Sequence, residues 1–121
     1  MKGVASALKT YLSGFDLPAY SIGSIPDPVE LPYISFPLTE PEWNQKASFY
    51  VQIWYRTRSN SDLLEKADEI VSDIGTCKNI PIDGGYLVIY PETPLIQFMV
   101  DGDFRSAYIN LSINAYHVPG L

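Results

Sequence analysis

The sequence has one cysteine, Cys77, and one histidine, His117, among its 121 residues. A lone cysteine forms no disulfide within the chain and supplies too few thiolates for a cysteine zinc site. A single histidine leaves little for a histidine metal centre or for acid–base catalysis at neutral pH. We therefore predict that the protein holds neither a metal ion nor a cofactor.

Basic residues and long apolar runs are also scarce. Eight Lys and Arg stand against fourteen Asp and Glu, which gives a formal charge of −6. Readers of duplex DNA owe most of their affinity to Lys and Arg on phosphates, so we expect no such role. No apolar run approaches the roughly 20 residues that a membrane helix needs. The first ten residues also lack the continuous apolar stretch of a signal peptide. We expect no membrane partner.

Motifs of catalysis are missing as well. The chain has no phosphate-binding or dinucleotide-binding glycine loop, no nucleophile elbow and no histidine pair of a zinc protease. Asp101 and Asp103 flank Gly102, but the further acidic ligands of a calcium loop do not follow, so we expect a tight turn here. Cys77 follows a predicted helix end, where the helix dipole disfavours a thiolate. The sequence therefore predicts a protein that is not an enzyme.

The composition is instead that of one folded domain, residues 1–121. Hydrophobic residues make up 46% of the chain and charged residues 18%, which suits a protein with one core. Apolar residues recur at helical spacing over residues 1–13 and Gly14 follows them. This pattern predicts a short N-terminal helix that stops at the glycine.

Residues 49–118 predict a core of one strand, one helix and three further strands. Residues 49–58 alternate apolar with polar side chains, and an apolar stripe up to Ile74 predicts a helix capped by Ser59 or Ser61. We expect Gly75 to end this helix and a turn to follow at residues 81–85. Strands are predicted at residues 86–90 and 95–100, joined by a hairpin at 91–94, and a last strand is predicted at 104–118. The predicted fold is α+β, with an antiparallel sheet of four to five strands and two helices packed on one face.

Residues 15–48 differ from the rest, because they hold six of the ten prolines. Proline lacks the amide donor that a central strand needs, so we predict a proline-rich arm or hairpin, extended mainly at residues 31–38. The arm carries more aromatic residues than a linker needs. We expect it to pack on its own domain or on a neighbouring subunit.

Two groups of residues are candidates for contacts between subunits. Aromatic residues and arginine are enriched at protein interfaces. The first group is the outward face of the strand at residues 49–58, namely Tyr50, Trp54, Arg56 and Arg58. The second is the aromatic arm, namely Tyr33, Phe36 and Trp43. A second layer or the arm of the same subunit is an equally good cover for the strand face, and the sequence leaves this choice open.

One stretch also resembles a known family. Residues 49–62 read Phe-Tyr-Val-Gln-Ile-Trp-Tyr-Arg-Thr-Arg-Ser-Asn-Ser-Asp and lead into the helix that ends at Ile74. This stretch, the long last strand around residues 108–116 and the chain length resemble the tail terminator, or tail completion, and minor capsid proteins of long-tailed bacteriophages. The proline-rich residues 15–48 depart from that pattern.

The resemblance implies an α+β virion protein that forms a ring, typically a hexamer, and is made in the cytoplasm of the bacterial host. Such a ring sits on the head-proximal end of the tail tube, stops its polymerisation and meets the head connector, or stopper, protein. DNA only passes through its channel, and no catalytic residues belong to the family. Another neck or minor capsid component is an alternative, and so is a small ligand-binding α+β module.

Overall fold

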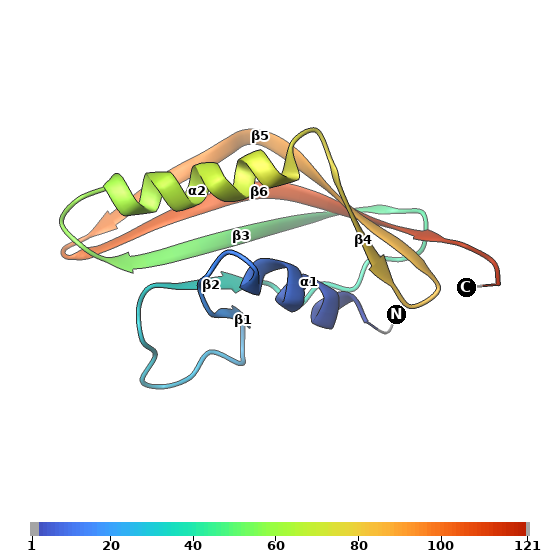
Figure 1. The fold of residues 1–121 in the computed structure, drawn as a ribbon, viewed down its shortest axis with the longest axis horizontal. Helices are drawn as coiled ribbons and strands as arrows, with labels where there is room; N and C mark the ends of the chain where they lie inside the picture. The colour runs from blue at the N-terminus through green and yellow to red at the C-terminus, as the bar shows by residue number, and fades with distance from the viewer. Residues whose placement is uncertain (1–2, 121) are drawn as a thin grey trace.

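The computed structural model describes residues 3–120. It contains two helices and six strands (Figure 1). In chain order they are α1 (Val4–Ser13), β1 (Ala19–Ser21), β2 (Tyr33–Phe36), β3 (Lys46–Arg56), α2 (Ser61–Ile74), β4 (Lys78–Ile82), β5 (Gly85–Asp101) and β6 (Phe104–His117). Among these residues no helix has the length and apolar character needed to cross a bilayer.

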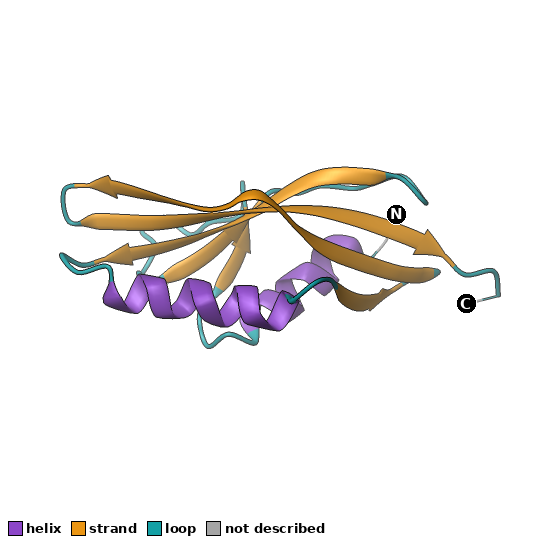
Figure 2. Ribbon diagram, turned by 90° about the horizontal axis from the view of Figure 1, so that it is seen from above, coloured by secondary structure: helices purple, strands orange, loops and turns teal. Residues whose placement is uncertain are grey.

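The strands form one curled sheet in the order β1-β2-β3-β6-β5-β4. All neighbours are antiparallel except β1 and β2, which are parallel. Both helices lie on one face of the sheet, as Figure 2 shows from above. The predicted α+β class and the placing of the helices are therefore confirmed. The predicted sheet of four to five antiparallel strands is wrong in strand number and in the one parallel pair.

Both predicted helices are present, and their apolar stripes explain where they pack. The buried residues of α2 recur at helical spacing, and Gly75 ends the helix with a φ of 58°. That φ lies in the left-handed region, which glycine adopts without steric cost. The predicted serine caps are not observed: α2 begins after Asn60 without a side-chain cap, and the Ser59 hydroxyl accepts a hydrogen bond from the Ser61 amide instead.

The proline-rich segment supplies two short strands at the edge of the sheet. The extended piece predicted at residues 31–38 contains β2, which pairs with β3. The three residues of β1 then add to β2 as the last strand on this side of the sheet. Short edge strands tolerate the neighbouring prolines, because few of their amides have a partner to lose.

The predicted hairpin at residues 91–94 is not formed. Residues 85–101 make one long strand, β5, with a register shift between Pro91 and Ile96 along its pairing with β6. The turn predicted at residues 81–85 begins later, because residues 78–82 form β4, which pairs with β5 only as far as Ile89. Beyond that point β5 is an edge strand, so Pro91 and Pro94 interrupt no ladder on its outer side.

The hydrophobic core lies between the sheet and the helices. Strands β3 and β6 form its centre, with Val51 opposite Ile109 and Ile53 opposite Ala107, all four buried. The predicted alternation along β6 is confirmed, because every second residue from Ala107 to Ala115 faces this core. The remaining residues of these strands face the other side of the sheet, which no helix covers (Figure 2).

Candidate assembly surfaces

The uncovered face of the sheet carries a row of aromatic side chains that begins at its short-strand edge. The Tyr20 and Tyr33 rings lie 6.1 Å apart, and Tyr33 stacks on Trp54 at the same distance with an interplanar angle of 17°. The indole N–H of Trp54 donates a hydrogen bond of 3.0 Å to the Ser35 hydroxyl. Strand β2 of the arm therefore lies beside β3 in the sheet of its own subunit, and its outward side chains contact those of the strand face.

This packing corrects part of the predicted interface. Phe36 keeps only 1% of its surface exposed because it faces the helix-covered core, where it contacts Phe49. Tyr33 is buried under its aromatic neighbours. Trp43 is half-buried, with its ring 5.1 Å from that of His117. The aromatic arm therefore does not form a separate exposed contact surface, and Phe36 and Tyr33 have little exposed surface left for contact with another subunit.

The other predicted residues remain at the surface to different degrees. Tyr50 is half-buried and stacks on Tyr108 with ring centroids 4.4 Å apart. Trp54 is also half-buried, whereas Arg56 and Arg58 are exposed. The guanidinium of Arg56 lies over the Phe104 ring, 5.0 Å from its centroid. The arginine end of this strand face is therefore its most accessible part.

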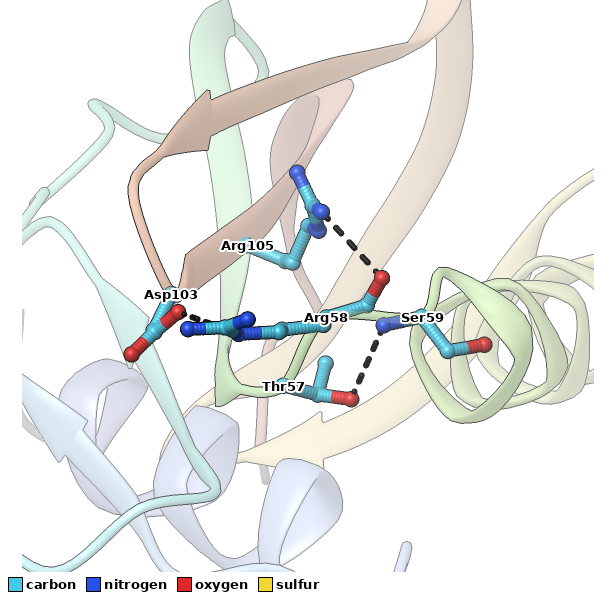
Figure 3. A network of polar contacts seen from close by, with 5 residues as sticks. All are labelled: Thr57, Arg58, Ser59, Asp103 and Arg105. Atoms are coloured by element: carbon cyan, nitrogen blue, oxygen red, sulfur yellow. Dashed lines mark hydrogen bonds and ion pairs between the residues drawn. The ribbon is translucent and has the colours of Figure 1, made fainter.

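A polar network fixes this arginine end to the turn between β5 and β6 (Figure 3). The Arg58 Nε lies 3.0 Å from a carboxylate oxygen of Asp103, and Arg105 donates a hydrogen bond of 3.2 Å to the Arg58 carbonyl. The Ser59 amide donates to the Thr57 hydroxyl in the same loop. These contacts hold the loop before α2 and the β5–β6 turn together, so that the arginines and the turn form one end of the molecule.

Sequence reasoning missed one exposed surface, the tip of the β5–β6 hairpin. Phe98, Met99, Val100 and Phe104 are all exposed there. The available signal was the run from Leu95 to Val100, in which five of six residues are apolar and none is charged, glycine or proline. The run predicts a strand, but it does not show that the strand extends past the cover of the helices.

The hydroxyl of Tyr11 on α1 donates a hydrogen bond of 2.6 Å to the Asp73 carboxylate on α2. This bond, aided by Lys78 and opposed by burial, holds the pKa of Asp73 below its ordinary value of 3.8. Burial and the same hydrogen bond raise the pKa of Tyr11. The pair joins the two helices at the end of the molecule that carries β4.

We expect this pair to make stability depend on pH in acid. Because the pKa of Asp73 is lowered on folding, its contribution is present above about pH 4 and is lost as the pH falls through the folded pKa. Tyr11→Phe should flatten the acid limb of the unfolding free energy measured by urea titration between pH 2 and 5, by less than about 1 kcal/mol for this exposed bond. Asp73→Asn should flatten it at least as much, because it also removes the contact with Lys78. An unchanged limb in Tyr11→Phe would contradict the assignment.

The described residues bring together no cluster of metal ligands. In the range 3–120 no three His, Cys, Asp or Glu side chains lie close enough together to hold a metal ion. Cys77 is exposed after α2, and His117 is exposed at the end of β6 against Trp43. The Asp101–Asp103 segment is the turn between β5 and β6, as predicted.

The uncovered face also carries a groove of about 560 Å³ next to the β5 register shift. Its walls include the stacked Tyr50 and Tyr108, with Glu92 and Asn110 as polar groups. Asn110 donates hydrogen bonds to the Pro94 carbonyl and to Gln97, so its amide is engaged within the chain.

The sequence matches no profile of a known protein family, and no curated protein sequence matches it significantly.

Proposed function

We propose that this chain is a structural subunit of a phage particle, a ring-forming tail terminator that caps the tail tube and completes the head–tail joint. Another neck or minor capsid role is the alternative within the same class. The proposal is supported by the resemblance of residues 49–62 and of the last strand to tail terminator and minor capsid proteins of long-tailed bacteriophages. It rests on one structural observation: the chain presents two unlike surfaces of opposite charge.

The basic surface contains all three arginines of the chain, Arg56, Arg58 and Arg105. They gather at one end of the sheet, beside the β5–β6 turn. The acidic surface is the exposed side of α2, where Asp62, Glu65 and Asp68 make no ion pair with a described residue. A ring needs such a pair of different patches, because each subunit meets the next one head to tail.

The acidic balance suits a channel through which DNA passes. Six copies, each with a formal charge of −6, carry about −36 in total. A channel wall with part of this charge repels the DNA backbone instead of retaining it. We therefore expect a purified ring to release DNA even at low salt.

Light scattering coupled to size-exclusion chromatography tests the proposal. We expect a mass near six subunits for the purified chain, alone or after addition of purified tail tubes. The double variant Arg56→Glu, Arg58→Glu should lose this assembly and keep its circular dichroism spectrum, because both side chains are exposed. Raising the salt concentration should weaken the wild-type assembly in the same way.

The control is Lys9→Glu, one charge reversal of the same kind at an exposed position of α1. It should assemble like the wild type. A wild-type chain that stays monomeric both alone and with tubes would overturn the proposal. Saturable binding of a small ligand by such a monomer would favour the ligand-binding module, for which the groove of about 560 Å³ is the one specific observation.

A further inference from the structure

The groove of about 560 Å³ on the uncovered face of the sheet is walled on two sides. Its floor lies over the two central strands, with Tyr50 from β3 and with Tyr108 and Asn110 from β6. One wall is the segment after β2, at Thr39, and the other is β5, at Glu92. Both helices lie on the opposite face of the sheet and leave the groove open (Figure 2). Its volume falls in the range of about 300–1,000 Å³ that is usual for ligand pockets.

The wall that β5 supplies is built into the fold. The register shift between Pro91 and Ile96 leaves residues 92–95 opposite Asn110 alone. The Asn110 amide donates a hydrogen bond to the Pro94 carbonyl and so holds this bulged segment against β6. Bulges are common beside active sites, where they re-aim side chains. The wall is therefore formed in the free chain, and a ligand does not have to order it.

The lining of the groove is close to neutral. Among the described residues that line it, Glu92 is the one charged side chain, and Lys46 lies 3.3 Å from its carboxylate. An anionic ligand would therefore meet a carboxylate and no unpaired cation. The other polar side chains of the lining include the hydroxyls of Thr39, Ser48 and Thr93. Groups of this kind suit a ligand that is polar but uncharged.

A buried hydroxyl adjoins the floor of the groove. Ser112 pairs with Ser48 and lies two residues from Asn110 on the same face of β6. Only 2% of its surface is exposed, and its hydroxyl has no hydrogen-bond partner among the described residues. Buried polar groups rarely stay unpaired. An unpaired hydroxyl beside the floor therefore favours a ligand that brings hydrogen-bonding groups of its own.

Tyr50 and Tyr108 give the floor an aromatic surface. Their rings stack with centroids 4.4 Å apart and an interplanar angle of 19°, and both side chains are half-buried. A tyrosine presents an apolar ring and a polar hydroxyl, so it pairs with groups that have both characters. A sugar has them, because one face of its ring carries C–H groups and its edge carries hydroxyls. A cavity of about 150 Å³ holds one benzene ring, so this groove has room for two sugar rings.

We propose that this groove binds a neutral saccharide of two or more sugar units. The C–H face of one sugar lies on the rings of Tyr50 and Tyr108. Its hydroxyls bond to Thr39, Thr93 and Glu92. A nucleotide fits less well, because its phosphates need cations that the lining lacks. A peptide strand would pair with a sheet edge, whereas the floor of this groove lies over the central strands.

The inference goes beyond the proposed function and does not depend on it. The proposed ring contacts use the arginine end of the sheet and the acidic side of α2, and neither contributes a residue to the lining of the groove. A subunit in a ring and a free subunit should therefore bind the saccharide alike.

Saturation-transfer NMR and isothermal titration calorimetry test the site, with maltose, cellobiose and N,N′-diacetylchitobiose as neutral probes. We expect at least one of them to bind at a single site per chain with a Kd of about 1 mM or tighter. Saturation transfer should be strongest at the sugar ring protons, which contact the tyrosines. Failure of all three probes to bind at about 10 mM would overturn the inference.

Variants locate the binding. Thr93→Trp fills the groove from an exposed position and should abolish binding without changing the circular dichroism spectrum. Its control is Thr10→Trp, the same change at an exposed position of α1, on the opposite face of the sheet, and it should bind like the wild type. Tyr50→Ala should weaken binding at least about tenfold, whereas Tyr50→Phe keeps the ring and should stay within about twofold. Binding that persists in Thr93→Trp and Tyr50→Ala would lie elsewhere and overturn the inference.

Light scattering on the same samples separates this inference from the proposed function. Rings that bind none of the probes would overturn the saccharide site and leave the proposed function standing. A chain that binds a probe in the groove, yet stays monomeric alone and with tail tubes, would support the site and overturn the ring.

Discussion

Replacing Gly85 with alanine is expected to destabilise the protein by at least about 3 kcal/mol and to lower its Tm by more than about 10 °C. A Cβ atom at this position would lie 1.8 Å from the Tyr116 carbonyl oxygen and 3.2 Å from the His117 Cα. These are backbone atoms of β6, so no side-chain rotation relieves the clash. Strands β5 and β6 would have to separate where Gly85 pairs with His117.

Thermal unfolding followed by circular dichroism measures this effect, with Gly102→Ala as the matched control. Gly102 has a φ of 59°, but a Cβ there meets nothing within 4 Å. The control should therefore cost only the strain of a left-handed alanine, about 1 kcal/mol. Equal losses in the two variants would contradict the close approach of β5 and β6 at Gly85.

The parts of the fold that were predictable are those whose burial follows from local periodicity. The stripe of α2 and the alternation of β6 each fix one apolar face over ten residues or more, and such a face must be covered. Strand β4 has only five residues, one of them Pro81, so its pattern is too short to predict a strand. Its existence depends on pairing with β5, which is a tertiary effect.

The candidate surfaces were predictable only in part, for a related reason. Arg56 and Arg58 are exposed because they come at the end of β3, where the strand leaves the sheet. The sequence predicts Tyr33 and Phe36 as interface residues because they are aromatic, yet the pairing of β2 with β3 places Tyr33 against Trp54 and Phe36 in the helix-covered core. No local pattern encodes a pairing between strands that lie about twenty residues apart.

Ile109→Ala is expected to cost about 2–5 kcal/mol of unfolding free energy. Ile109 is fully buried near the middle of β6, between Val51 on β3 and Ile96 on β5. Truncation removes apolar contacts and leaves a cavity that the flanking strands cannot close, because their positions are fixed by hydrogen bonds on both sides. Urea titration followed by tryptophan fluorescence measures the loss.

The matched control is Ile22→Ala, the same truncation at a residue that exposes 46% of its surface. It should change the unfolding free energy by less than about 0.5 kcal/mol. Because Ile109 lies on the covered face and the proposed contacts use the exposed arginines and the acidic side of α2, Ile109→Ala should weaken folding in monomer and oligomer alike. Oligomers that dissociate before any loss of secondary structure in this variant would instead place Ile109 in an assembly contact and contradict the sheet orientation described above.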